Sequence, residues 1–111
     1  MIPQVRPTDF DTWVQAQDGR PLVLDVREPW ELQVASVAPG DFDLLAIPMN
    51  QVPARMGELP QSRAIACLCH HGVRSHRVAL FLAQQGYADV ANIAGGIEAW
   101  ARERDPSVPQ Y

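Results

Sequence analysis

Short apolar runs that alternate with amphipathic segments constrain the fold of this chain more than any other feature of its sequence. Four runs are apolar at successive positions, and we interpret them as buried strands: 21–26 (PLVLDV), 44–48 (LLAIP), 64–69 (AIACLC) and 90–93 (VANI). A short strand near Gln4–Val5 is expected to open the fold. Unbroken apolar runs, rather than alternating ones, are typical of strands covered on both faces. The pattern therefore predicts an α/β fold with a parallel sheet between two layers of helices.

Helical segments are expected between these strands. Thr8 is suited to cap a first helix, and Pro29 is suited to the first turn of a second helix at about 30–35. Further helical segments are predicted at 50–58, at 74–85 with Gly86 as the stop, and at 96–103 before Pro106. Ligands of parallel sheets bind beyond the carboxyl ends of the strands. Cys69 stands at one of those ends.

The composition indicates one ordinary globular domain, which we expect to cover residues 1–111. Of these residues 47% are hydrophobic and 20% are charged, so a core can form without disulfides or a structural metal. No apolar run approaches the roughly 20 residues that cross a bilayer, and the N-terminus shows no export-signal pattern. A net charge of −4 argues against nucleic acid and against an anionic membrane as partners. We therefore expect a cytoplasmic protein with neither of those partners.

The charged residues are unevenly placed along the chain. All nine basic residues are arginines, which excludes lysine-dependent chemistry such as Schiff-base formation. The segment 59–88 contains no aspartate or glutamate, although it holds Arg63, Arg74, Arg77 and all three histidines. A chance cluster would explain this distribution, but a cationic segment around Cys69 in an acidic protein favours a site for a small anion.

The stretch CHHGVRS, residues 69–75, has the composition of a loop built for a reactive thiol. The helix that follows offers backbone N–H groups and the positive end of its dipole, and both stabilise a nearby anion. Gly72 permits a positive φ, so that successive N–H groups can point inward as an anion-binding nest. Arg74 adds a permanent positive charge with a planar set of donors. The alternative is a buried structural cysteine before an ordinary strand-to-helix turn.

The motifs LDVRE, CHHGVRS and GYADVANIAGGIEAW, in this order, resemble those of a single-domain rhodanese, a sulfurtransferase. The resemblance covers nearly the whole chain and departs from the family at 35–50, where the usual HIPGA-type segment is absent. It implies a three-layer α/β/α fold with five parallel strands in the order 3-2-4-5-1. It also implies that Cys69 is the nucleophile and carries a persulfide, without a cofactor or a metal. The expected donor is a small anion such as thiosulfate, and the expected acceptor is cyanide, a thiol or a partner protein.

The resemblance also assigns the residues around the nucleophile. Asp25 and Arg27, at the end of the second strand, are expected to support the site, the alternative being a surface salt link. The residues expected to form the active-site loop and bind substrate are His70, His71, Gly72, Val73, Arg74 and Ser75.

Three alternatives to a thiosulfate sulfurtransferase stay open at this point. A protein-facing persulfide carrier or interaction module would use the same loop, and similar domains are fused to adenylyltransferases that serve sulfur-carrier proteins. Cysteine-dependent phosphatases share the fold but have one more residue between cysteine and arginine, whereas four residues separate Cys69 from Arg74 here. A soft-metal site of the two cysteines and the histidines lacks the usual paired ligand spacing. Cys67 is interpreted as a small core residue, with a role as a resolving thiol as the minor alternative.

Overall fold

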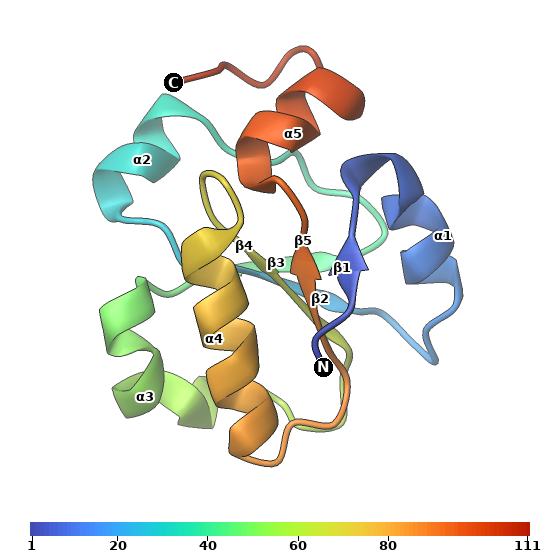
Figure 1. Ribbon diagram of the computed structural model, residues 1–111, viewed down its shortest axis with the longest axis vertical. Coiled ribbons are helices and arrows are strands. Elements are labelled where there is room, and N and C mark those ends of the chain that lie inside the picture. Colours follow the sequence, from blue (N-terminus) through green and yellow to red (C-terminus); the bar gives the residue numbers. More distant parts are fainter.

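The computed structural model describes residues 1–111 and contains one parallel sheet of five strands (Figure 1). The strands lie in the order β1-β5-β4-β2-β3, which confirms the predicted order 3-2-4-5-1 counted from the opposite edge. Their bounds are β1 Gln4–Val5, β2 Leu22–Asp25, β3 Asp43–Ala46, β4 Ile65–Leu68 and β5 Val90–Ile93.

The helices occupy the segments that the sequence predicted, with small differences at their ends. Their bounds are α1 Phe10–Gln15, α2 Pro29–Val34, α3 Val52–Arg55, α4 Val73–Gln84 and α5 Gly96–Glu103. The expectation that Thr8 caps the first helix is wrong. Thr8 lies inside a 3₁₀ turn, Pro7–Asp9, and the residue that precedes α1 is Asp9, whose side chain makes no capping hydrogen bond. Proline at the first position of that turn presets its φ, so the chain begins to coil before α1.

Two apolar cores, one on each face of the sheet, produce the three layers. Alternate residues of β2 enter different cores: Leu24 packs with Val78 of α4, and Val23 packs with Phe10 of α1. Helices α3 and α4 cover one face, whereas α1 and α5 cover the other (Figure 1). No helix combines the length and the apolar character that a membrane span requires.

The strand β3 differs from the expectation that every strand is covered on both faces. Its residues alternate between half-buried and exposed, whereas β2, β4 and β5 are buried throughout. The reason is its position, because β3 pairs only with β2 and forms an edge of the sheet.

The register of the parallel strands brings distant residues together at the carboxyl ends of the strands. Asp25 lies opposite Leu68, so the segment after β2 runs beside the segment that begins at Cys69. Asn92 of β5 lies opposite Cys67 of β4, one residue before the end of that strand. Tyr111 lies at the same end of the strands, above the loop between β4 and α4 (Figure 1), and its ring stacks on that of His70.

Candidate active site

Cys69 is the first residue after β4, and the loop that follows bends back over its sulfur. The side chain is buried, with 1% of the residue exposed, and Sγ accepts a hydrogen bond from the backbone N–H of Gly72 at 3.1 Å. Gly72 has a φ of 98°, as the nest interpretation requires, and it directly precedes α4. The sequence-based expectation of a curled loop at the helix N-terminus is therefore confirmed.

The N-terminus of α5 holds this loop from above. The N–H of Ile97 donates to the carbonyl of Cys69 at 2.8 Å, and the N–H of Glu98 donates to the carbonyl of His70 at 3.2 Å. A Cβ at Gly96 would lie 2.5 Å from the oxygen of Cys69 and 2.4 Å from that of His70. Only glycine permits this approach, so the β5–α5 turn and the β4–α4 loop are interlocked.

Ser75 and Asn92 form a buried polar pair behind the sulfur. The hydroxyl oxygen of Ser75 lies 3.2 Å from Cys69 Sγ and 2.5 Å from Asn92 Oδ1. Asn92 uses both hydrogens of its amide, on the carbonyl of Gly72 at 3.1 Å and on Gln4 at 2.9 Å. Its Oδ1 therefore depends on Ser75 for a donor. A hydroxyl has a single proton, which cannot serve Asn92 and a thiolate at the same time.

Asn92 was not among the residues that the sequence assigned to the site. The signal that would have found it is an amide within the apolar run VANI, since a buried polar group requires hydrogen-bond partners. Its side-chain partners, Gln4, Gly72 and Ser75, come from two other segments of the chain, and no local pattern identifies them.

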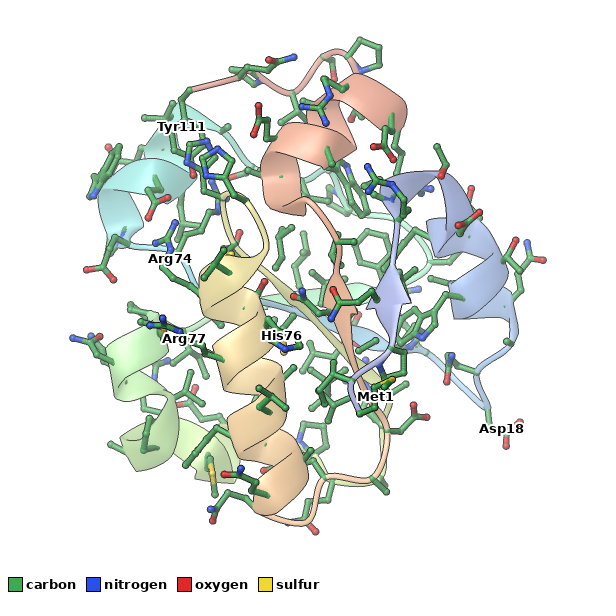
Figure 2. All side chains as sticks on the ribbon, in the orientation of Figure 1. Met1, Asp18, Arg74, His76, Arg77 and Tyr111 are labelled. Carbon is green, nitrogen blue, oxygen red and sulfur yellow. The ribbon has the colours of Figure 1, made fainter.

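Arg74 does not stand free above the loop. Its guanidinium forms a bidentate ion pair with Glu31 of α2, at 2.7 and 2.8 Å, and Figure 2 shows it on the side of α4 that faces α2. Hydrogen bonding to Arg74, with a further bond from Tyr111, lowers the pKa of Glu31 to about 2 against the opposing effect of burial. The same ion pair raises the pKa of Arg74 above its ordinary value. Glu31, which is 2% exposed, is a second residue that the sequence interpretation missed.

Asp25 and Arg27 form a buried ion pair, so the alternative of a surface salt link is wrong. Arg27 is fully buried and donates to both carboxylate oxygens of Asp25, at 2.9 and 2.8 Å. It also donates to the hydroxyl of Tyr111 at 3.0 Å, and that hydroxyl donates to Glu31 at 2.7 Å. One continuous network thus runs from Asp25 to Arg74.

The two loop histidines are stacked rather than paired with the sulfur. The ring of His70 lies 3.8 Å from that of Tyr111 on one side and 3.8 Å from that of His71 on the other. Burial lowers the pKa of His70, with a contribution from the neighbouring His71, and its Nε2 has no hydrogen-bond partner. His71 extends to Glu98, with Nε2 at 2.9 Å from the carboxylate. Of the remaining predicted loop residues, Val73 is exposed.

Cys67 lies in the core beneath the site, as expected. It is completely buried, and burial raises the pKa of its thiol to about 12. Both properties oppose a role as a nucleophile or a resolving thiol. Across the structure, no three His, Cys, Asp or Glu side chains gather in an arrangement that would hold a metal ion.

A small cavity lies beside the loop, on the side of Arg74. Its volume is about 230 Å³, and it is lined by Val26, Glu28, Met49, Asn50 and Arg74. Arg74 lines this cavity, and its guanidinium also interacts electrostatically with Cys69. A ligand that approaches the loop from this side therefore meets the Arg74–Glu31 pair.

Comparison with known proteins identifies the family of this fold and loop. The family profile described as Rhodanese-like domain matches residues 9–103. The chain belongs to the rhodanese family. It is 40% identical over 87 residues to a sulfurtransferase of Allochromatium vinosum, a match that covers 78% of each protein.

Two further relatives extend the comparison. The adenylyltransferase and sulfurtransferase MOCS3-2 of Zea mays is 35% identical over 100 residues, which are 86% of this chain but 21% of that protein. Among solved structures, a rhodanese-related protein of Thermoplasma volcanium has a TM-score of 0.78 at 30% identity, covering 98% of this chain and 99% of the other. These rhodanese relatives support sulfur transfer as the class of function.

Proposed function

We propose that this protein is a sulfurtransferase that carries sulfane sulfur as a persulfide on Cys69. It takes the sulfur from thiosulfate or a related donor and passes it to cyanide or another thiophile. The observation that carries this proposal is the position of Cys69 Sγ, within reach of the N–H of Gly72 and the hydroxyl of Ser75. Both groups can donate to sulfur that bears negative charge, and charge-assisted hydrogen bonds of this kind are the strong ones.

The proposed reaction has two steps. The Cys69 thiolate attacks the outer sulfur of thiosulfate, the S–S bond breaks, and sulfite leaves with the bonding electron pair. The persulfide anion, Cys69–S–S⁻, then donates its outer sulfur to cyanide, which leaves as thiocyanate and restores the thiolate. Covalent catalysis that divides a reaction in this way gives ping-pong kinetics.

Substitution of the nucleophile tests the proposal. Cys69→Ser should abolish thiocyanate formation from thiosulfate and cyanide, and Cys67→Ser should retain most of it. After incubation with the donor, intact mass should rise by one sulfur atom in the wild type and remain unchanged in Cys69→Ser. Undiminished sulfur transfer by Cys69→Ser would refute the persulfide mechanism.

A protein-facing persulfide carrier is the second candidate function. It is supported by the relative from Zea mays, whose name joins adenylyltransferase and sulfurtransferase activities and of which this chain spans only 21%. In that case a partner protein supplies or receives the sulfur, and thiosulfate is a poor donor with a high KM. A persulfide on Cys69 in the freshly purified protein, together with weak thiosulfate kinetics, would favour this candidate.

The phosphatase alternative has less support. The loop Cys69–Arg74 is one residue shorter than that of phosphatases with this fold, and the backbone N–H of Gly72 already contacts the sulfur. We expect no hydrolysis of aryl phosphates. Turnover of these esters that disappears in Cys69→Ser would reverse this assignment.

A further inference from the structure

The ion pair between Arg74 and Glu31 determines the charge that the cavity beside Arg74 presents to a sulfur donor. Both oxygens of Glu31 contact Arg74, so the charge of this guanidinium is compensated within 3 Å. Glu28 is the other charged residue of the adjacent cavity, and it is acidic. The nearest further arginine along the network, Arg27, is compensated in the same way by Asp25. A dianion that enters this cavity therefore meets no uncompensated cation among its lining residues. The separate cavity that includes Gly72 and Asn92 is lined by Arg77, which has no acidic partner, so the compensation by Glu31 concerns the Arg74 side of the site.

The structure also shows why Glu31 does not simply release Arg74 to a ligand. Glu31 is 2% exposed and is held by the hydroxyl of Tyr111 at 2.7 Å and by the N–H of Glu28 at 3.1 Å. Moving Arg74 away would leave a buried carboxylate without its cation, which is strongly unfavourable. The pair is therefore expected to persist when a donor binds.

Arg74 nevertheless keeps donors for a ligand. A guanidinium has five N–H groups, and two of them serve Glu31. The side chain is 32% exposed and lines the cavity, so the remaining N–H groups are accessible to an acceptor there. Such a site is suited to a polar ligand of low charge rather than to a small dianion.

We propose that Glu31 is a specificity-determining residue that disfavours dianionic donors such as thiosulfate and favours persulfides carried on a thiol, R–S–SH. This inference rests on the proposed function and narrows its donor. The Cys69 thiolate attacks the outer sulfur of R–S–SH, the S–S bond breaks, and the thiol sulfur leaves with the electron pair. The proton of the donor moves to that leaving thiolate. The products are Cys69–S–S⁻ and R–SH, so charge and atoms balance.

The test compares Glu31→Gln with the wild type, with thiosulfate and cysteine persulfide as donors. Glu31→Gln keeps the shape of the side chain and leaves the charge of Arg74 uncompensated. We expect kcat/KM for thiosulfate to rise on the order of tenfold through a lower KM, with a change below about threefold for cysteine persulfide. Glu58→Gln is the matched control, because Glu58 forms a similar bidentate pair with Arg55, at 2.7 and 3.0 Å, away from the site.

The outcomes separate this inference from the proposed function. Unchanged or lower use of thiosulfate by a Glu31→Gln protein that still reacts with cysteine persulfide would overturn the inference. An equal rise in Glu58→Gln would also overturn it, because net charge rather than the pair would then be responsible. Failure of both donors to place sulfur on Cys69 in the wild type would instead refute the proposed function.

A measurement on the wild type covers the case in which Glu31→Gln does not fold. Salt screens electrostatic steering, so a free cation at the site would make kcat/KM for thiosulfate fall as ionic strength rises. With Arg74 compensated by Glu31, we expect this quantity to stay constant or to rise between low and high salt. A steep fall would show that Arg74 acts as an uncompensated cation and would overturn the inference.

Discussion

At the scale of single residues, the proton of the Ser75 hydroxyl links the nucleophile to the core. While Cys69 is a thiol, it can donate to Ser75 Oγ, and Ser75 can donate to Asn92. When Cys69 becomes a thiolate, the hydroxyl must turn to it, and Asn92 Oδ1 is left without a donor. A buried acceptor without a partner costs about 1–3 kcal/mol. Asn92 therefore competes with the sulfur for the single hydroxyl proton of Ser75.

Asn92→Ala tests this role. Because the hydroxyl of Ser75 then has no competing acceptor and can donate to the sulfur, alkylation of Cys69 by iodoacetamide at a fixed pH should become roughly tenfold faster. Ser75→Ala removes the donor itself, so alkylation should become slower. A change of both rates in the same direction would contradict the proton arrangement described here.

At the scale of elements, the site depends on two strand-to-helix turns that hold each other. Gly96, at a φ of 63°, lies against the carbonyls of Cys69 and His70, and the first N–H groups of α5 bond to those carbonyls. The loop that holds the nucleophile is thereby fixed from a helix that contributes no side chain to the sulfur. The approach is close enough that a methyl group at this position must displace the loop.

Gly96→Ala should therefore reduce activity far more than its backbone strain alone explains. Gly86→Ala is the control, because Gly86 also has a positive φ, 97°, but a Cβ there meets nothing within 4 Å. Both variants should lose about 1–2 kcal/mol from the left-handed conformation of a non-glycine residue. Only Gly96→Ala should lose persulfide formation, by about a hundredfold or more, since catalytic geometry is sensitive to shifts near 1 Å. Comparable kinetics for the two variants would show that the interlock is unimportant.

At the scale of the whole molecule, the buried network from Asp25 to Arg74 couples stability to pH. The pKa of Glu31 is about 2 in the folded protein, against 4.5 ordinarily, so the folded state binds its proton less readily than the unfolded chain. The stabilisation is complete above pH 4.5 and is lost as the pH falls toward 2. Its size is about 3 kcal/mol by linkage.

Urea unfolding of the wild type and of Glu31→Gln between pH 6 and roughly pH 2 measures this contribution. The free energy of unfolding of the wild type should fall more steeply with acid, and the two curves should converge. Parallel curves would show that Glu31 does not titrate in this range.

Tyr111 contributes its hydroxyl to this network from a position far along the chain from Arg27 and Glu31. It bonds to two charged groups, Arg27 at 3.0 Å and Glu31 at 2.7 Å. Tyr111→Phe should cost about 2 kcal/mol in urea unfolding, because hydrogen bonds to charged groups contribute more than neutral ones. Tyr87→Phe is the control, since the hydroxyl of Tyr87 bonds only to the neutral carbonyls of Met56 and Leu59, and should cost about 1 kcal/mol. An equal cost for both would argue against the charged network.

The local features of this protein could be predicted from its amino-acid sequence. The apolar runs predicted the strands, because a segment buried on both faces shows this in its own composition. Glycine and proline marked turns and helix ends through their backbone preferences, as Gly72 and Pro29 do. The loop that begins at Cys69 could be identified because its parts are consecutive in the chain. The strand order came from the family resemblance and was confirmed.

The groups that surround that loop could not be predicted from the sequence, because the fold brings them there from distant positions in the chain. Arg74 and Glu31 are 43 residues apart, Ser75 and Asn92 are 17 apart, and Tyr111 and Glu31 are 80 apart. The sequence predicted a permanent positive charge at Arg74, but it could not show whether a neighbouring carboxylate compensates that charge. Compensation depends on which carboxylate the packing of α2 brings within hydrogen-bond distance. That distance is a property of the folded chain, because hydrogen bonds and ion pairs depend on separation in space and not on separation in sequence.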